Sequence, residues 1–272
     1  MSCEWQYISS KSNALAVRLA KLKDKKYRRL EGLFRFDGIK LFCEAASNGA
    51  PIRYVLVSES AADKYKKTVE ESASGAHLLI LADEVFAKMT DELSPEGIIT
   101  VCESLPGVVV LDKECEGLRD GAKRTTLMLE SVRDAGNIGT IIRSARAFGI
   151  DRLVISSDCA DLYNSKTVRA AMGALFTQNI FIVDSIADAV RAIREGGSRV
   201  FAAALVRDAK RLGDVELKCG DAILIGNEGH GLSREAIESC DECIYIPMED
   251  GSESLNAGIA ASVCMWEMYK IK

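Results

Sequence analysis

Three short segments in the second half of the chain combine glycines with polar side chains that could do chemistry. The first is Asp134–Arg143, in which Gly136 and Gly139 let the backbone turn tightly into a helix. The free N–H groups at such a helix start can bind an anion. Asn137 and Arg143 lie on this turn and on the early helix. An ordinary capped helix with a surface arginine has the same pattern, so this segment alone leaves both interpretations open.

The second segment, Ile225–Ser233, follows an apolar stretch and contains three glycines in six residues. Gly226, Gly229 and Gly231 would allow a ligand to approach the backbone closely. Their G-x-x-G-x-G spacing differs from the G-x-G-x-x-G of dinucleotide-binding proteins, and the chain has no G-x-x-x-x-G-K-S/T motif. A nucleotide-binding oxidoreductase is therefore not favoured. Glu228 could bond a ligand or the chain itself, and a flexible loop remains the alternative.

The third segment, Ile246–Asn256, leads into an alanine-rich helix. Ser254 or Asn256 would be a normal cap for that helix, which is the simplest interpretation of the segment. The small alanine side chains would permit close packing of the helix against another backbone.

Alternating strands and helices must position these segments. In the first part of the chain, apolar patterns predict strands at 52–57, 78–81 and 97–101 and helices at 11–30, 61–71 and 83–89. In the second part they predict strands at 126–130, 152–155, 181–183, 200–204, 222–225 and 243–246 and helices at 138–148, 166–172, 186–194, 234–239 and 255–269. Short, continuously apolar strands between helices indicate a mostly parallel sheet covered on both faces.

These patterns predict two α/β domains in the 272 residues. We expect a first domain at 1–104, a connection rich in glycine and proline at 105–124, and a second domain at 125–272.

Charge is distributed unevenly along the chain. The formal net charge is −5, but residues 1–40 contain ten Lys and Arg and four acidic residues, a balance of +6, which leaves −11 for the remainder. A basic face on an acidic body is typical of a protein that contacts nucleic acid. A solvated helix is the alternative interpretation of such a run.

The nine cysteines are odd in number and irregularly spaced, which favours a reduced, cytosolic chain over a disulfide framework. No stretch has the pattern of a signal peptide or the length of a membrane span. Cys240 and Cys243 form a single C-x-x-C, and His77 and His230 are distant in sequence, so a four-ligand zinc site is not expected. We therefore expect a cytoplasmic protein without a membrane or metal partner.

In their order and spacing, the three segments resemble the motifs of the SpoU family of tRNA and rRNA ribose 2′-O-methyltransferases, within the SPOUT superfamily. Members read D-P-G-N-x-G-x-x-x-R, then G-x-E-G-x-G, then I-P-M followed by S-L-N. Ala135 stands here in place of the usual proline. The resemblance covers about Thr125–Lys272, and Asp161–Gly173 is similar to the family's intermediate segment, with Arg169 at its basic position.

The N-terminal part is similar to the family's L30e-like substrate-binding domain. Arg35-Phe-Asp-Gly38 resembles its F-x-x-E-G motif, with Asp37 in place of glutamate. Together with the basic start of the chain, this predicts RNA contacts by Arg28, Arg29, Arg35 and Arg169.

The resemblance implies an α/β fold whose C-terminal domain contains a deep trefoil knot, S-adenosyl-L-methionine as the cofactor, and a homodimer in which two protomers complete the site. By position it implies a cofactor site made of Gly226, Glu228, Gly229, Ile246, Met248 and Leu255. It implies a catalytic neighbourhood made of Asn137, Arg143, Glu228, Ser254 and Asn256.

The chemistry of methyl transfer is compatible with these residues. A sulfonium activates the methyl group, so positioning supplies much of the catalysis, whereas a ribose hydroxyl is a poor nucleophile until its proton is drawn away. A guanidinium almost never deprotonates, so we expect Arg143 to grip the adjacent phosphate and the developing oxyanion. We predict a methyltransferase that acts on the ribose 2′-hydroxyl of structured RNA, with rRNA favoured over tRNA. The alternative is a non-catalytic RNA-binding protein of the same fold.

Overall fold

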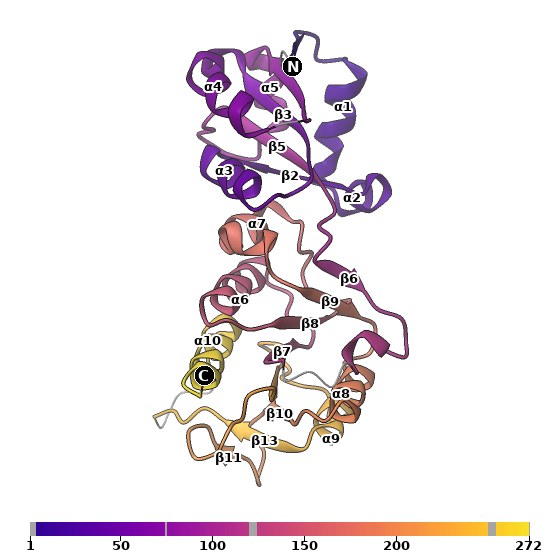
Figure 1. Ribbon diagram of the computed structural model, residues 1–272, viewed down its shortest axis with the longest axis vertical. Coiled ribbons are helices and arrows are strands. Elements are labelled where there is room, and N and C mark those ends of the chain that lie inside the picture. The colour runs from indigo at the N-terminus through magenta and orange to yellow at the C-terminus, as the bar shows by residue number, and fades with distance from the viewer. Residues whose placement is uncertain (1–3, 74, 120–123, 250–253, 272) are drawn as a thin grey trace. The chain divides into compact units, whose positions relative to one another are not determined.

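The computed structural model describes residues 4–73, 75–119, 124–249 and 254–271. They form two compact units, Met1–Pro106 with Asp161–Phe176, and Gly107–Ala160 with Thr177–Lys272 (Figure 1). The segment Asp161–Phe176 was expected in the second domain, but it belongs to the first unit. Of the expected connection at 105–124, residues 120–123 lie outside the described residues.

The first unit is built on a five-stranded mixed sheet in the order β1-β4-β3-β5-β2. Its strands are β1 (Trp5–Ile8), β2 (Leu33–Asp37), β3 (Ile52–Ser58), β4 (His77–Leu81) and β5 (Ile98–Glu103). Its helices are α1 (Ala14–Ala20), α2 (Lys25–Glu31), α3 (Ile39–Ser47), α4 (Ala62–Ser72), α5 (Asp83–Met89) and α7 (Ser165–Ala171). Residues of α1 and α5 pack with Leu56 in one apolar cluster, and residues of α3 and α4 pack with Val55 and Val57 in another. Alternate residues of β3 therefore serve opposite faces of the sheet.

The helix predicted at 11–30 is divided in the structure. Asp24 has an extended backbone, with φ −90° and ψ 132°, and separates a short 3-10 turn at Lys21–Lys23 from α2. Leu15, Leu19 and Leu22 all precede the break at Asp24, so their spacing could not show where the first helix ends. The strands β1 and β2 and the helix α3 were not predicted.

The second unit is built on an eight-stranded sheet in the order β11-β13-β10-β12-β7-β8-β9-β6. Its strands are β6 (Val108–Val110), β7 (Thr126–Leu129), β8 (Arg152–Ser156), β9 (Ile180–Val183), β10 (Val200–Ala203), β11 (Lys210–Arg211), β12 (Ala222–Ile225) and β13 (Glu242–Tyr245). All pairings between these described strands are parallel, which confirms the predicted type of sheet. The trefoil knot stays a prediction.

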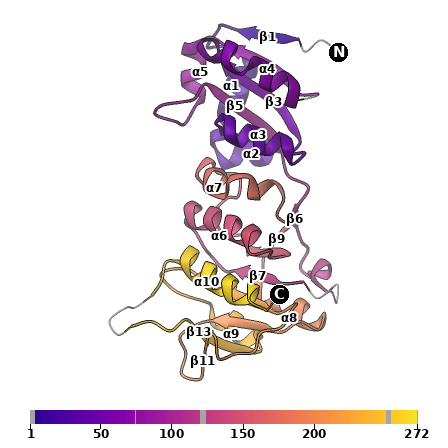
Figure 2. The same cartoon turned by 60° about the vertical axis from the view of Figure 1, so that its left-hand side comes forward.

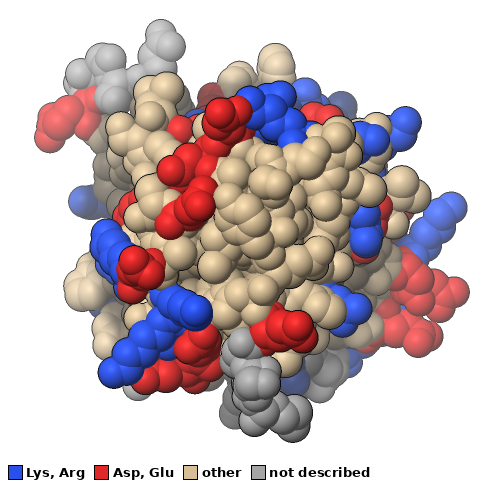
Figure 3. Space-filling model, turned by 90° about the horizontal axis from the view of Figure 1, so that it is seen from above, with Lys and Arg blue, Asp and Glu red and all other residues tan. Residues whose placement is uncertain are grey.

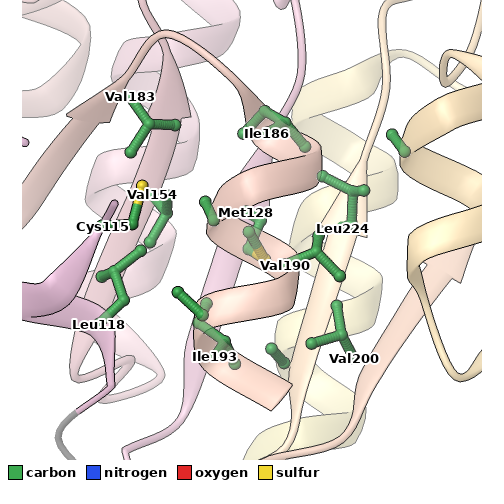
Figure 4. Packing of buried hydrophobic residues seen from close by; sticks show 14 residues of the cluster. Cys115, Leu118, Met128, Val154, Val183, Ile186, Val190, Ile193, Val200 and Leu224 are labelled. Carbon is green, nitrogen blue, oxygen red and sulfur yellow. The ribbon is translucent and has the colours of Figure 1, made fainter. Parts of the chain in front are cut away.

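Helices cover this sheet on both faces. They are α6 (Ala135–Ala147), α8 (Ile186–Glu195), α9 (Arg234–Ser239) and α10 (Ala257–Tyr269). Val190 and Ile193 of α8 pack with Met128, Val154 and Leu224 from three neighbouring strands (Figure 4). The two views show α6 and α10 side by side, and the Ser144 and Ser262 hydroxyls join them at 3.0 Å (Figure 2).

The sheet has a topological switch point between β7 and β12, where the strands are added on opposite sides. The chain runs from β7 to β8 and β9 on one side, and β12, β10 and β13 lie on the other side. In open parallel sheets, ligands bind outside the carboxyl ends of the strands at such a switch point. The loops after β7, β12 and β13 all begin at this edge. The second and third predicted motifs lie in the loops after β12 and β13, and the first begins at the end of the loop after β7 and continues into α6.

Candidate active site

A cavity of about 450 Å³ lies at the carboxyl edge of the parallel sheet. It is lined by the ends of β10, β12 and β13 and by the start of α10. All six residues predicted to bind the cofactor line this cavity, namely Gly226, Glu228, Gly229, Ile246, Met248 and Leu255. Ser254, predicted as catalytic, also lines it. The second and third motif segments thus meet in one cavity, whose volume is in the range of small-molecule sites.

The loop after β12 is held in a tight turn by its own backbone. Asn227 and Gly231 exchange N–H···O hydrogen bonds of 3.0 and 2.9 Å, and Gly231 has a left-handed φ of +67°. A Cβ atom on Gly226 would lie 2.4 to 2.6 Å from backbone atoms of Gly231 and Leu232. Gly226 is therefore required by the turn itself, whereas the sequence suggested that glycine leaves space for a ligand.

Glu228 is linked by hydrogen bonds to two other predicted catalytic residues. The Asn137 Nδ2 atom donates to Glu228 Oε1 at 2.5 Å, and Asn256 Nδ2 donates to Asn137 Oδ1 at 3.0 Å. Asn256 Oδ1 in turn accepts from the N–H groups of Gly258 and Ile259 at the start of α10. One chain of amides therefore fixes the Glu228 carboxylate against the first turns of two helices.

Arg143 is not part of this series of hydrogen-bonded amides. It is exposed in the third turn of α6, beyond the early helix where it was expected, and it does not line the cavity. It lies six positions after Asn137 in the helix, which corresponds to about 9 Å along the axis and roughly 240° around it. Its side chain makes no hydrogen bond or ion pair with another described residue, so its guanidinium is available to a ligand.

The four arginines predicted to bind RNA have different surroundings. Arg28 and Arg35 are buried, with 7% and 3% of their surface exposed. Arg28 pairs with Asp161, and Arg35 pairs with Asp91 and donates to the Met89 carbonyl. Burial lowers the pKa of Arg35, and the nearby carboxylates oppose this effect. These contacts favour structural roles for both side chains.

Arg29 and Arg169 remain closer to solvent. Arg29 is exposed, and Arg169 is partly exposed and pairs with Glu92. The basic start of the chain is also balanced by ion pairs of Lys11, Arg18 and Lys23 with acidic residues. On the face of the first unit shown in Figure 3, blue and red side chains are accordingly interspersed.

The lone C-x-x-C does not form part of a metal cluster within the described ranges, where no group of three or more His, Cys, Asp or Glu side chains could hold a metal ion. Burial raises the pKa of Cys240 to about 12, and the neighbouring Cys243 adds to the effect. In the part of the chain that the structure describes, no helix is both long and apolar enough to span a membrane.

The fold and site define an α/β protein with a small-molecule site at a switch point and a separate N-terminal unit. Residues 124–266 match the SpoU rRNA methylase family, and residues 14–100 match the MRM3-like substrate-binding domain. The chain belongs to the SpoU rRNA methylase family. This membership confirms the predicted class of enzyme, a methyltransferase.

The chain is similar to two relatives that are named as 23S rRNA methyltransferases. The chain is 27% identical to the 23S rRNA (guanosine(2553)-2′-O)-methyltransferase RlmP of Bacillus subtilis, over 96% of this chain and 98% of that protein. It is 30% identical to the 23S rRNA (guanosine-2′-O-)-methyltransferase RlmB of Nitrosomonas europaea, over 72% of this chain and 75% of that protein.

Solved structures of similar proteins include cofactor complexes. An rRNA methyltransferase from Sinorhizobium meliloti with AdoMet (S-adenosylmethionine) bound is 25% identical, with a TM-score of 0.83 and 98% of each chain covered. The SpoU methyltransferase AviRb from Streptomyces viridochromogenes, in complex with AdoMet, is also 25% identical, with a TM-score of 0.81, covering 95% of this chain and 97% of that one.

Proposed function

We propose that the protein transfers the methyl group of S-adenosylmethionine to a ribose 2′-hydroxyl of ribosomal RNA. The observation that carries this proposal is the meeting of all six predicted cofactor residues in one cavity, with Glu228 of that cavity tied to Asn137 and Asn256. The RlmP and RlmB relatives, which are named for 2′-O-methylation of 23S rRNA, support ribosomal RNA as the substrate.

The residues of the cavity fit the cofactor. Ile246, Met248 and Leu255 provide apolar contacts, and the glycines at 226 and 229 expose backbone to a ligand. When bound, S-adenosylmethionine supplies an activated methyl group. The chain's contribution is then to hold the 2′-oxygen in line with that methyl group and to exclude competing geometries.

The hydroxyl proton must leave as the oxygen–carbon bond forms. We propose that Arg143 binds the phosphate next to the target ribose, because its planar guanidinium can donate two parallel hydrogen bonds and stays protonated. The phosphate oxygen then accepts the proton, and the same guanidinium stabilises the developing charge on the 2′-oxygen. Glu228 and Asn137, fixed by Asn256, orient the groups at the mouth of the cavity.

We further propose that the enzyme is a homodimer and that Arg143 of one copy serves the cavity of the other. Arg143 does not line the cavity of its own chain. On α10, Ile259, Trp266 and Tyr269 are 54%, 49% and 46% exposed, and the Trp266 and Tyr269 rings stack with centroids 5.9 Å apart. An apolar surface of this kind is typical of an interface.

The buried thiols of Cys102, Cys115, Cys159 and Cys264 are free, which supports the proposal that the protein acts in a reducing compartment, the cytoplasm.

The substrate proposal is tested by incubating the protein with methyl-labelled S-adenosylmethionine and, separately, with unmodified rRNA and unmodified tRNA. We expect label in rRNA alone. Label in tRNA alone would overturn the choice of substrate, and RNA binding without any transfer would instead support a non-catalytic RNA-binding protein.

The shared site is tested by mixing two inactive variants. Arg143→Ala removes the fork, and Gly226→Val disrupts the cofactor loop. If each cavity uses the Arg143 of the other copy, random exchange of subunits restores about a quarter of the wild-type sites. No recovery in a mixture that has exchanged subunits would show that Arg143 acts within its own chain.

A further inference from the structure

The cofactor loop at 226–233 is anchored at two points by the carboxyl end of β7. At the far point, the Glu130 carboxylate accepts from the backbone N–H and the hydroxyl of Ser233, at 2.8 and 2.7 Å. At the near point, Asn227 Nδ2 donates to the Ser131 carbonyl at 2.7 Å. Neither Glu130 nor Ser131 lines the cavity.

The Asn227 side chain connects the Ser131 carbonyl to the rest of the loop. Its Oδ1 atom accepts from the N–H groups of Gly229 and His230, at 2.8 and 3.2 Å. The loop then closes through the two backbone bonds between Asn227 and Gly231. The position of the Asn227 side chain therefore sets the backbone on both sides of Glu228, and the Ser131 carbonyl sets the position of Asn227.

Ser131 has an unusual backbone that needs support. Its φ is +54°, a left-handed conformation that side chains other than glycine rarely adopt. Two hydrogen bonds hold it there. Its N–H donates to Ser156 Oγ at 2.8 Å, and its hydroxyl donates to Asp158 Oδ2 at 2.6 Å. Left-handed residues of this kind persist where the surroundings determine them, and they cluster at functional sites.

Asp158 accepts hydrogen bonds from both the Ser131 and the Ser156 hydroxyl. Its Oδ1 accepts from the Ser156 hydroxyl at 2.6 Å, and its Oδ2 also accepts from Arg133 at 3.3 Å. Burial opposes the charged form, but the hydrogen bonds from Ser131, Ser156 and Arg133 outweigh the burial and lower the pKa of Asp158. The carboxylate is thus charged at neutral pH and can accept all three bonds.

We propose that Asp158 is a positioning residue for the cofactor loop, which acts through Ser131 and Asn227 to fix the N–H groups of Gly229 and His230 and the place of Glu228. The inference rests on the proposed cofactor site. Asp158 follows β8, in a segment that none of the three motifs includes. Because Glu130 holds the other end of the loop independently, loss of Asp158 should loosen the near end and leave the fold intact.

The test measures S-adenosylmethionine affinity by calorimetry in wild type, Asp158→Ala, Asp158→Asn and a control. We expect Asp158→Ala to weaken binding about tenfold, the effect of losing a hydrogen bond to a charged group. Asp158→Asn keeps one acceptor oxygen and should fall between the two. The control is Asp151→Ala, because Asp151 accepts from the Thr125 N–H at 2.7 Å at the opposite end of β7 and β8. It should lower the unfolding temperature without changing affinity.

Ser131→Gly separates positioning from stability. Glycine adopts a left-handed φ without strain, so this variant removes the hydroxyl that reaches Asp158 and should not destabilise the fold. If the bond between Ser131 and Asp158 positions the loop, Ser131→Gly should bind the cofactor more weakly and keep its unfolding temperature. A purely structural bond would not give this combination.

A double-mutant cycle tests the route through Asn227. If Asp158 acts through Asn227, Asp158→Ala should change affinity less than about twofold in an Asn227→Ala background, whereas independent effects would multiply. Multiplying effects, or an unchanged affinity in both Asp158→Ala and Ser131→Gly, would overturn the inference. A wild-type protein that does not bind S-adenosylmethionine would instead refute the proposed cofactor site.

Discussion

Replacement of Gly226 by alanine isolates the tight turn of the cofactor loop. The φ of Gly226 is not in the left-handed region, so alanine can adopt this backbone, and the contacts of the new Cβ decide the result. That atom would lie 2.4 Å from the Gly231 carbonyl carbon and 2.6 Å from the Leu232 nitrogen. These are backbone atoms that cannot rotate away, so the two sides of the turn must separate.

The expected magnitude follows from the bonds that this separation breaks. The turn is closed by two backbone hydrogen bonds between Asn227 and Gly231. Each contributes about 0.5–1.5 kcal/mol, so their loss costs about 1–3 kcal/mol. If the cofactor requires the closed turn, its affinity should fall by roughly 5- to 150-fold.

The assay is calorimetric titration with S-adenosylmethionine, with Gly117→Ala as the control, because Gly117 does not line the cavity. A Cβ at Gly117 meets only Leu111 Cδ2, the end of a flexible side chain, at 3.2 Å. This variant should bind within about threefold of wild type, since no bond of the turn is broken. Wild-type affinity in Gly226→Ala, or an equal loss in both variants, would refute the argument that the turn shapes the site.

Further variants address the roles of Arg143, of two N-terminal arginines and of the exposed surface of α10. Arg143→Ala should slow single-turnover methyl transfer by about 100- to 1,000-fold at saturating cofactor and RNA while sparing cofactor affinity, with Arg143→Lys between the two; an unchanged rate would remove Arg143 from the mechanism. Arg35→Ala removes the buried donor to the Met89 carbonyl and one of the two cations paired with Asp91, and it should destabilise the protein by about 1–3 kcal/mol in denaturant unfolding; a stable Arg35→Ala would contradict its structural role. The exposed Arg29→Ala should reduce the salt dependence of RNA binding by about one phosphate contact. Trp266→Glu places a charge in the exposed apolar surface of α10, so light scattering should show dimers for the wild type and monomers for the variant. If the variant keeps the mass of the wild-type dimer, the interface lies elsewhere.

The parallel sheet and its motifs could be predicted from the sequence because both depend on local patterns. Short apolar strands such as Ala222–Ile225 are separated by helices, and the glycine spacing of 226–231 and the helix cap at Asn256 are visible in the letters alone. The order of the motifs identified the family, and the six residues that the resemblance assigned to the cofactor line one cavity.

Other features depend on contacts that no local pattern encodes. Arg28 and Arg35 look like any basic residues in sequence, and only their distant partners Asp161 and Asp91 reveal that they are buried. Asp158 and Ser131 are 27 residues apart, and their bond depends on the pairing of β7 with β8. Asn227 had a usable signal, since an asparagine between Gly226 and Glu228 is typical of a turn that its side chain closes.

The central claim, methylation of a ribose oxygen, is tested most directly by the alkali sensitivity of the labelled RNA. Alkaline cleavage of RNA requires a free 2′-hydroxyl, so a 2′-O-methyl group protects the adjacent phosphodiester. After transfer of a labelled methyl group from S-adenosylmethionine to rRNA and complete alkaline hydrolysis, we predict that the label is recovered in an alkali-resistant dinucleotide. Recovery of the label in mononucleotides would show that the enzyme methylates a base and would contradict the proposed reaction.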